Sequence, residues 1–405
     1  MAWDIRPTRD LDEFLDAIGA ISHYFGAERD LERAERFSRN LPFERMHAAF
    51  DGDRIVGGAG AFPFQLTVPG GPVACGGVTV VGVLPTHRRR GVLTAMMRAQ
   101  LEDIRDRREP IAALWASEEP IYRRFGYGLA SLSGEIGLAS GYTGLREAPD
   151  PTASSRLVTL EEAKSLAPPV YDRVRRYTPG MFERTQTWWE TRTLADPPDR
   201  RQGSGVKNAV LLELGGEPAG YALYRITPKF EHGSSVGRVE VIEAIAHGPV
   251  ATRELWRVLL EMDWFATLEA YLLPIDHPLM HQLRYPRRMQ MRVGDGLWVR
   301  LVDIGAALSA RTYGGDGRIV LEVEDVFLPE NAGRWRIADG KAERTDEDAD
   351  LALDVGELGA AYLGGFTFAE LRHAGTVREL REGGAARADA VFLTDSPKPW
   401  CPEIF

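Results

Sequence analysis

The sequence predicts a multidomain protein of mixed α+β and α/β class, and three observations lead to this prediction. The chain has 405 residues, which exceeds one ordinary domain and suits two or three. Strand-like runs alternate with amphipathic helical patterns over most of the chain. The order of these elements between residues 47 and 115 returns between residues 210 and 273.

The first segment combines a helix, a β-meander, a second helix and a short strand. Apolar residues recur at helical spacing near the start: Leu11, Phe14, Leu15, Ile18 and Ile21. Residues 47–83 read as a meander with sharp turns at Asp51-Gly52 and Pro69–Pro72. An amphipathic helix follows over residues 92–104, and Ile111–Trp115 reads as a buried strand.

The second segment repeats this order. Its strands, turn and helix are predicted at residues 210–214, 215–218, 221–226, 239–246, 255–260 and 270–273. The loop before the helix, His247–Thr252, contains no arginine cluster. We therefore expect an internal repeat that has lost its ligand loop, with an unrelated α+β unit as the alternative.

The third segment alternates strand-like and helical pieces. Strands are expected around Gly317–Phe327 and Arg334–Ala338, and helical pieces around Ala360–Leu363 and Phe366–Leu371. The resulting domains cover residues 1–138, 139–294 and 295–405.

Composition excludes several classes of protein. The net charge of −10 argues against a nucleic-acid binder and suits a small cationic substrate. The two cysteines, Cys75 and Cys401, lie far apart with no metal-ligand spacing, which predicts no metal, no disulfide framework and a reducing cytoplasm. Charged residues interrupt any N-terminal signal, and no apolar run reaches the ~18 residues of a membrane span.

The run Pro-Thr-His-Arg-Arg-Arg-Gly, residues 85–91, is the strongest functional signal. It lies between a strand and the start of a helix, whose free N–H groups and partial positive charge favour phosphates. Gly91 leaves space for phosphates to approach the backbone, and Arg88–Arg90 add charge-assisted contacts to a coenzyme such as CoA. A solvated basic loop is the alternative, and the run lacks the Gly-Lys-Ser/Thr of a nucleotide P-loop.

Two further features suit acyl transfer from a thioester. Gly82 within the strand predicts a bulge or a close backbone approach, and a bulge there would free backbone groups for the amide-rich pantetheine arm. Residues 117–127, Ser-Glu-Glu-Pro-Ile-Tyr-Arg-Arg-Phe-Gly-Tyr, supply a tyrosine that would protonate the leaving thiolate. Tyr127 is the candidate and Tyr122 its competitor.

These residues resemble the GNAT acetyltransferase superfamily, whose CoA loop reads Arg/Gln-x-x-Gly-x-Gly/Ala. With residues 85–91 and 117–127 together, the chain is similar over essentially its whole length to the Eis (enhanced intracellular survival) N-acetyltransferases. The resemblance implies tandem GNAT domains, the second degenerate, and a C-terminal sterol-carrier-protein-like domain. It also implies acetyl-CoA as cosubstrate, aminoglycosides or other amines as acceptors, and a homohexamer.

The resemblance assigns roles to residues of this chain. Tyr127 is the proton donor and the terminal carboxylate of Phe405 is the general base, which is ionised at neutral pH. The implied donor-binding residues are Val81, Gly82, Val83, Arg88, Arg89, Arg90, Gly91, Val92, Leu93, Thr94, Ile121 and Tyr122. The large apolar residues of Trp400–Phe405 favour a buried C-terminus, with ordinary packing of that terminus as the alternative.

Two positions depart from the family pattern. Leu93 stands where a small residue is usual, so one phosphate-facing amide is expected to be less accessible. Ile404 replaces the acidic residue that often precedes the terminal aromatic, and Glu403 lies one step back, where it is expected to attract a cationic substrate. Phe25 and Glu28 are expected to line the acceptor pocket.

The sequence thus predicts a cytoplasmic, acetyl-CoA-dependent N-acetyltransferase that modifies small cationic amines. The alternatives are a non-catalytic acyl-CoA or lipid binder and an acyltransferase that uses longer chains or acts on protein lysines.

Overall fold

The computed structural model describes residues 3–201, 203–314 and 317–405. By its internal contacts the chain forms two compact units. Unit 1 contains the residues up to Ser131, Leu297–Pro399 and Ile404–Phe405, and unit 2 contains Leu132–Gly296 and Trp400–Glu403. None of the described helices is long and apolar enough to cross a membrane.

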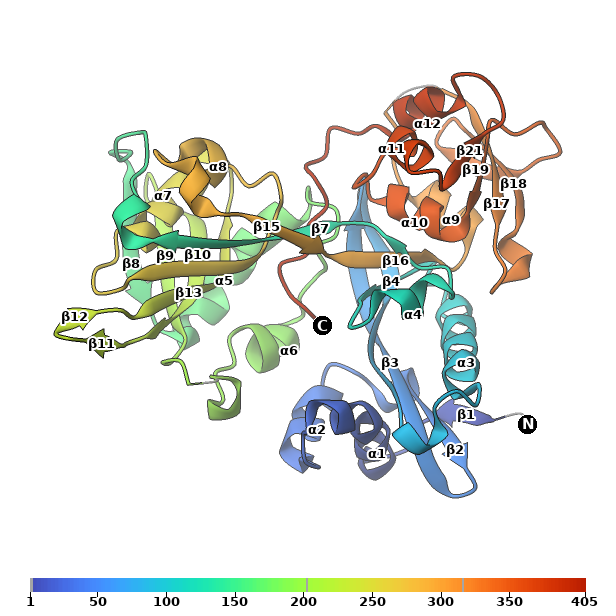
Figure 1. Cartoon of the computed structure of the whole chain (residues 1–405), viewed down its shortest axis with the longest axis horizontal. Coiled ribbons are helices and arrows are strands. Elements are labelled where there is room, and N and C mark those ends of the chain that lie inside the picture. The colour runs from blue at the N-terminus through green and yellow to red at the C-terminus, as the bar shows by residue number, and fades with distance from the viewer. Residues whose placement is uncertain (1–2, 202, 315–316) are drawn as a thin grey trace. The chain divides into compact units, whose positions relative to one another are not determined.

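The first sheet of unit 1 has seven strands in the order β1-β2-β3-β4-β5-β16-β6. Their bounds are β1 Asp4–Pro7, β2 Met46–Asp51, β3 Arg54–Val68, β4 Gly71–Val83, β5 Ile111–Trp115, β16 Leu297–Leu301 and β6 Gly128–Leu129. β4 and β5 run parallel, whereas the other neighbours are antiparallel. The long hairpin of β3 and β4 forms the centre of this sheet (Figure 1).

Helices cover both faces of this sheet, with α1 and α2 on one side of β3 and α3 on the other (Figure 1). The helices are α1 Leu11–Ser22, α2 Leu31–Ser38, α3 Val92–Asp106 and α4 Glu119–Arg123. Successive strand residues point to opposite faces, and a Cβ at Gly58 would meet α1 while one at Gly57 would meet Met96 of α3. Asp10 and Asp30 cap the N-termini of α1 and α2 with their side chains.

The remainder of unit 1 is a five-stranded sheet with its own helices. The strand order is β19-β18-β17-β20-β21, with bounds Lys341–Arg344, Gly333–Ala338, Ile319–Glu324, Leu351–Asp354 and Val377–Glu379. The helices are α9 Ile304–Ala310, α10 Val355–Tyr362, α11 Phe368–His373 and α12 Gly384–Phe392. Every residue of α10 is buried, because this helix packs on β16 and β6 of the first sheet as well as on β20.

Unit 2 contains a second seven-stranded sheet, in the order β15-β7-β14-β13-β10-β9-β8. Its strands are β15 Arg292–Asp295, β7 Leu132–Ala139, β14 Thr267–Leu273, β13 Arg238–Ala246, β10 Glu217–Thr227, β9 Asn208–Leu214 and β8 Ala153–Val158, with a small hairpin of β11 Phe230–Glu231 and β12 Ser234–Ser235. Its helices are α5 Leu160–Arg175, α6 Gln186–Trp188, α7 Pro249–Leu260 and α8 Leu279–Gln282.

The predicted repeat is present in this order of elements. In unit 2, β9, β10, β13, α7 and β14 come in the same order as β2, β3, β4, α3 and β5 in unit 1, and β13 pairs with β14 in parallel as β4 does with β5. The loop before α7 has Gly248 at the N-cap and no arginine.

Two strands that the sequence did not predict lie near the ends of the middle segment, β7 and β16. β7 pairs with β14 and β15 in the sheet of unit 2, whereas β16 inserts between β5 and β6 in the sheet of unit 1. The position of each strand depends on pairing with residues far away in the chain, which the periodicity of the sequence does not reveal.

Candidate active site

Strand β4 contains a bulge, as the sequence predicted, but the bulged residue is Val80 and not Gly82. Gly82 pairs with Gly58 and Thr79 pairs with Gly60, so Val80 and Val81 together oppose one residue of β3. Val80 has φ of 48°, which marks it as the bulged residue. Gly82 instead allows α1 to pack closely on β4, because a Cβ at this position would lie 2.7 Å from the Ile21 Cα.

Beyond Gly77, no strand among the described residues pairs with β4 on the side of β5. The parallel pairing of the two strands runs only from Cys75 to Gly77 on β4, and within the described residues no strand pairs there with the rest of β4. The N–H and C=O groups of β4 that point to this side beyond Gly77 therefore lack ladder partners. The arrangement leaves backbone donors and acceptors for an amide-rich ligand.

The N-terminus of α3 lies directly after this strand and a short 3₁₀ turn, Pro85–His87. Gly91 is the N-cap, with φ of 82°, and no side chain caps the helix. A Cβ at Gly91 would meet nothing within 4 Å, so the approach to the backbone is open. The amides of Val92, Leu93 and Thr94 precede the first intrahelical hydrogen bond, in which the Ala95 amide donates to the Gly91 carbonyl, and they point outwards along the helix axis.

Arg88, Arg89 and Arg90 are exposed beside this helix end. The Arg88 guanidinium lies 5.8 Å from the Tyr24 ring, and that of Arg90 lies 5.2 Å from the Trp3 ring. Among the described residues no carboxylate forms an ion pair with any of the three, which leaves their positive charges available to phosphates.

Leu93 is partly buried and packs against the hydrophobic clusters beneath α3. Its side chain therefore contributes to the interior. Ile121 packs against one of the same clusters, whereas Thr94 is exposed on the first turn of the helix.

Tyr122 and Tyr127 lie where β4 and β5 diverge. Both belong to the buried cluster that contains Val78 and Leu114, the residues that directly follow the last β4–β5 pair. The centres of their rings are 6.0 Å apart, and the ring planes are inclined at 75° to each other. The hydroxyl of Tyr122 bonds with Ser117, but that of Tyr127 is buried and has no hydrogen-bond partner among the described residues.

Both phenols are neutral over the physiological range. Burial raises the pKa of Tyr122 to about 12, although the bond with Ser117 opposes the rise. Burial also raises the pKa of Tyr127 well above its ordinary value, and the nearby charge of Arg300 opposes this effect without reversing it. An uncommitted hydroxyl that keeps its proton at neutral pH can act as a proton donor.

The C-terminal residue packs into unit 1. The Phe405 side chain is 8% exposed, and its ring lies edge-on to Phe64 of β3 at 4.9 Å. Phe64 stacks on Phe62 at 5.3 Å, and Phe62 lies 5.4 Å from Phe37 of α2. A row of aromatic rings thus links α2, β3 and the chain terminus.

A cavity of about 280 Å³ opens between α1, the following turn and α2. Phe37 and the bulged Val80 line it, so it borders both the aromatic row and the donor strand. The acidic residues that line it differ in the contacts they make. Asp16 lies 3.2 Å from Arg29, and Asp30 caps α2, whereas Glu28 is exposed and has no ion-pair partner among the residues described.

Two residues expected in the acceptor pocket lie elsewhere. The Phe25 side chain is 73% exposed and does not line this cavity. Glu403 lies half-buried in unit 2, where Arg184 and Arg192 bind its carboxylate, and it does not line this cavity either. Val80 and Phe37 line the cavity but were not predicted from the sequence, because the position of a bulge has no sequence signal and Phe37 resembles an ordinary core residue.

Comparisons with known proteins identify the domains of this chain. Residues 4–130 and 180–301 match models of the acetyltransferase (GNAT) domain, and residues 304–402 match the sterol carrier protein domain. An N-acetyltransferase of Streptomyces avermitilis is 40% identical over 412 residues, which cover 100% of both chains. The N-acetyltransferase Eis of Mycobacterium tuberculosis is 35% identical over 360 residues, 85% of each chain.

A solved structure extends the similarity to the fold. Eis1 from Mycobacterium abscessus has a TM-score of 0.85 and 34% identity, with 99% of this chain and 100% of that chain covered. The chain is therefore a GNAT acetyltransferase with two such domains and a sterol-carrier-like domain. Within that class it belongs to the Eis family of N-acetyltransferases.

Replacing Arg89 with glutamine is expected to raise the KM for acetyl-CoA about fivefold with little change in kcat. One charge-assisted phosphate contact contributes about 1 kcal/mol to binding. It stabilises bound acetyl-CoA equally in the ground state and in the transition state, so it affects KM and not kcat. Steady-state kinetics at varied donor concentration measure this change. The matched control is Arg378→Gln, which removes an exposed arginine from β21. Equal KM values in the two variants would exclude a donor contact at Arg89.

Proposed function

We propose that this enzyme acetylates an amine of a small cationic acceptor bound in the cavity beside Val80, with Tyr127 as general acid and the terminal carboxylate of Phe405 as general base. The observation that carries the proposal is the buried Tyr127 hydroxyl, which has no hydrogen-bond partner among the described residues. A buried hydroxyl without a partner is costly, and such groups commonly have a functional explanation.

The residues present fit the acetyl donor. The uncapped N-terminus of α3 and Arg88–Arg90 would hold its phosphates, and the unpaired edge of β4 would hold its pantetheine amides. The donor supplies an acetyl thioester. Because β4 separates from β5 beside Val78, the free strand edge leads to the cluster that contains Tyr127.

The two proton transfers fall to different residues. The Tyr127 hydroxyl gives its proton to the departing sulfur, and burial keeps that proton in place until the thiolate forms. A terminal carboxylate has an ordinary pKa near ~3.5 and is ionised at neutral pH, so the carboxylate of Phe405 accepts a proton from the attacking amine. Packing of the Phe405 ring on Phe64 supports this role by holding the terminus beside β3.

The charge of the cavity supports a cationic acceptor. Its lining contains the three carboxylates of Asp16, Glu28 and Asp30 and the two guanidiniums of Arg29 and Arg33. Glu28 has no ion-pair partner among the described residues, and the protein as a whole carries a net charge of −10. A protonated polyamine, aminoglycoside or lysine side chain would each find a favourable potential here.

The central test is Tyr127→Phe, which is expected to lower kcat by about 10²-fold or more with KM values nearly unchanged. Because the hydroxyl makes no hydrogen bond, its removal should not lower the thermal unfolding temperature. Single-turnover acetylation and thermal unfolding measure the two quantities.

The matched control for this test is Tyr122→Phe. That hydroxyl already bonds with Ser117, so the variant should lose less than about tenfold in kcat. A wild-type rate in Tyr127→Phe, or a larger loss in Tyr122→Phe, would contradict the assignment of the general acid.

The acceptor class is tested by Glu28→Gln. The variant is expected to raise the acceptor KM about fivefold for polycationic amines, because one exposed ion pair contributes about 1 kcal/mol. The effect should shrink as ionic strength rises. Initial rates with spermidine, an aminoglycoside and a lysine-containing peptide measure it, and Glu32→Gln on α2 serves as the control. An unchanged KM for all three acceptors would remove Glu28 from the acceptor site.

A further inference from the structure

Strand β16 carries an arginine into the buried cluster that contains Tyr127. Trp298 of β16 and Val302, directly after its end, both belong to that cluster. Alternate residues along a strand point to the same face of a sheet, so Arg300, which lies between them, faces the cluster too. A Cβ on Gly126, the residue before Tyr127, would collide with the Nη1 atom of Arg300. The guanidinium therefore packs against the turn that leads into Tyr127.

This guanidinium is enclosed but makes few bonds. Arg300 is 0% exposed, and its Nη2 atom lies 2.6 Å from a carboxylate oxygen of Asp325. Among the described residues, neither its Nε nor its Nη1 atom has a hydrogen-bond partner. Because buried donors without partners are costly, these two nitrogens indicate a role beyond holding the fold together.

The carboxylate that holds Arg300 is itself fixed by two other donors. The Leu328 amide donates to Asp325 at 2.9 Å, and the side-chain amide of Asn331 donates to it at 3.0 Å. Asp354, a second carboxyl that interacts with Arg300, accepts a hydrogen bond from the backbone of its own helix α10, and burial raises its pKa. Asp325 thus fixes Arg300 through a single nitrogen while it shares its own charge with two amides.

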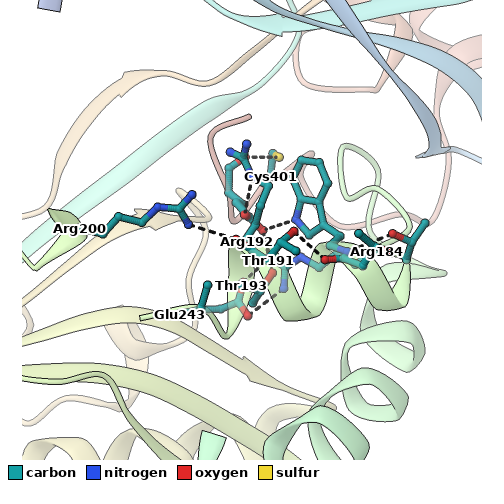
Figure 2. A network of polar contacts seen from close by, with 12 residues as sticks. Arg184, Thr191, Arg192, Thr193, Arg200, Glu243 and Cys401 are labelled. Atoms are coloured by element: carbon teal, nitrogen blue, oxygen red, sulfur yellow. Dashed lines mark hydrogen bonds and ion pairs between the residues drawn. The ribbon is translucent and has the colours of Figure 1, made fainter. Parts of the chain in front are cut away.

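Two other buried arginines use more of their nitrogens. In unit 1, all three side-chain nitrogens of Arg311 donate to backbone carbonyl groups, at 3.2, 3.0 and 2.7 Å. In unit 2, both Nη atoms of Arg184 donate to Glu243, at 3.0 and 2.5 Å, and Glu403 lies 2.9 Å from one of them (Figure 2). Arg300 differs from these arginines because most of its hydrogen-bonding capacity is unused.

Proton transfer from Tyr127 would leave a negative charge in this closed cluster. In the proposed step the O–H bond of Tyr127 breaks, an S–H bond forms at the departing sulfur, and the negative charge passes from the sulfur to the phenolate oxygen. Water returns a proton to the phenolate before the next turnover. An ordinary phenol, with a pKa of ~10, is a weaker acid than an ordinary thiol, with a pKa of ~8.5, so the transfer is uphill even in water.

The surroundings of Tyr127 make this transfer steeper, with one exception. Burial raises the pKa of Tyr127, and Tyr122 on α4 and Cys75 on β4 add to the rise. The positive charge of Arg300 acts in the opposite direction. A fixed charge that favours the phenolate lowers the barrier to proton donation, because it needs no rearrangement when the proton leaves.

We propose that Arg300 is a positioning residue that acts through Tyr127, by holding a positive charge in the same buried cluster to stabilise the phenolate as it forms. The inference rests on the proposed role of Tyr127 as general acid. It also gives the sterol-carrier-like domain a part in the reaction, because Asp325 lies within the matched residues 304–402. That domain supplies the carboxylate that fixes Arg300.

The experiment removes both charges of the pair. Arg300→Met alone would leave the Asp325 carboxylate buried without its cation and destabilise the fold, whereas neutral replacement of both partners is often tolerated. In the double variant Arg300→Met, Asp325→Asn, the single-turnover rate is expected to fall about tenfold or more. The KM for acetyl-CoA should stay within about twofold of the original.

Two further variants separate charge from structure. Arg300→Lys keeps the positive charge and should retain the single-turnover rate to within about threefold. Arg311→Lys is the control, because it breaks carbonyl bonds of another buried arginine; it should lower the thermal unfolding temperature and leave the rate unchanged. A loss in Arg300→Lys as large as in the double variant would overturn the inference.

A double-mutant cycle tests whether Arg300 acts through Tyr127. In a Tyr127→Phe background, neutralising the pair should have no further effect on the single-turnover rate, because no phenolate forms. An equal loss with and without the Tyr127 hydroxyl would show a merely structural role and overturn the inference.

The cycle also distinguishes this inference from the function on which it rests. A normal rate in Tyr127→Phe would contradict the proposed general acid itself. A low rate in Tyr127→Phe, together with a normal rate in the double variant of Arg300 and Asp325, would retain the acid and overturn the role of Arg300.

Discussion

The site depends on the separation of β4 from β5. Parallel pairing stops at Gly77, and the bulge at Val80 turns β4 away before α3 begins. This one break in a hydrogen-bond ladder leaves a free strand edge, places Val80 in the wall of the cavity, and directs the strand into an uncapped helix N-terminus at Gly91. Unpaired backbone groups destabilise a folded domain, and a bound ligand that forms hydrogen bonds with them removes this destabilisation.

Burial then sets the chemistry at this opening. Tyr127 is enclosed without a hydrogen-bond partner among the described residues, which keeps its proton in place and leaves its hydroxyl uncommitted. In Glu403 burial has the opposite outcome, since two arginines lower the pKa of its carboxyl and hold the group charged. The difference lies in the neighbours: a lone phenol stays neutral, whereas a carboxylate with two cations stays ionised. We propose that the first group transfers a proton.

Local patterns in the sequence predicted much of this molecule. The helical spacing of α1 and α3, the turns of the meander and the repeated element order are confirmed, because each depends on neighbouring residues. The sequence did not indicate that β16 joins the first sheet, that the bulge falls at Val80, or that Glu403 forms an ion pair with Arg184. Each of these depends on pairing between distant segments, and a polar residue near a terminus reads as exposed until its partner is known.

The terminal carboxylate can be tested without altering any side chain. Cys401 lies four residues before the end, so residues 1–400 can be joined by native chemical ligation to a synthetic peptide of residues 401–405 that ends in either an acid or an amide. The amide should retain the unfolding temperature of the acid and lose about 10²-fold or more in kcat, because it has no anionic oxygen to accept a proton. Equal kcat values for the two ligated enzymes would contradict the assignment of Phe405 as the base.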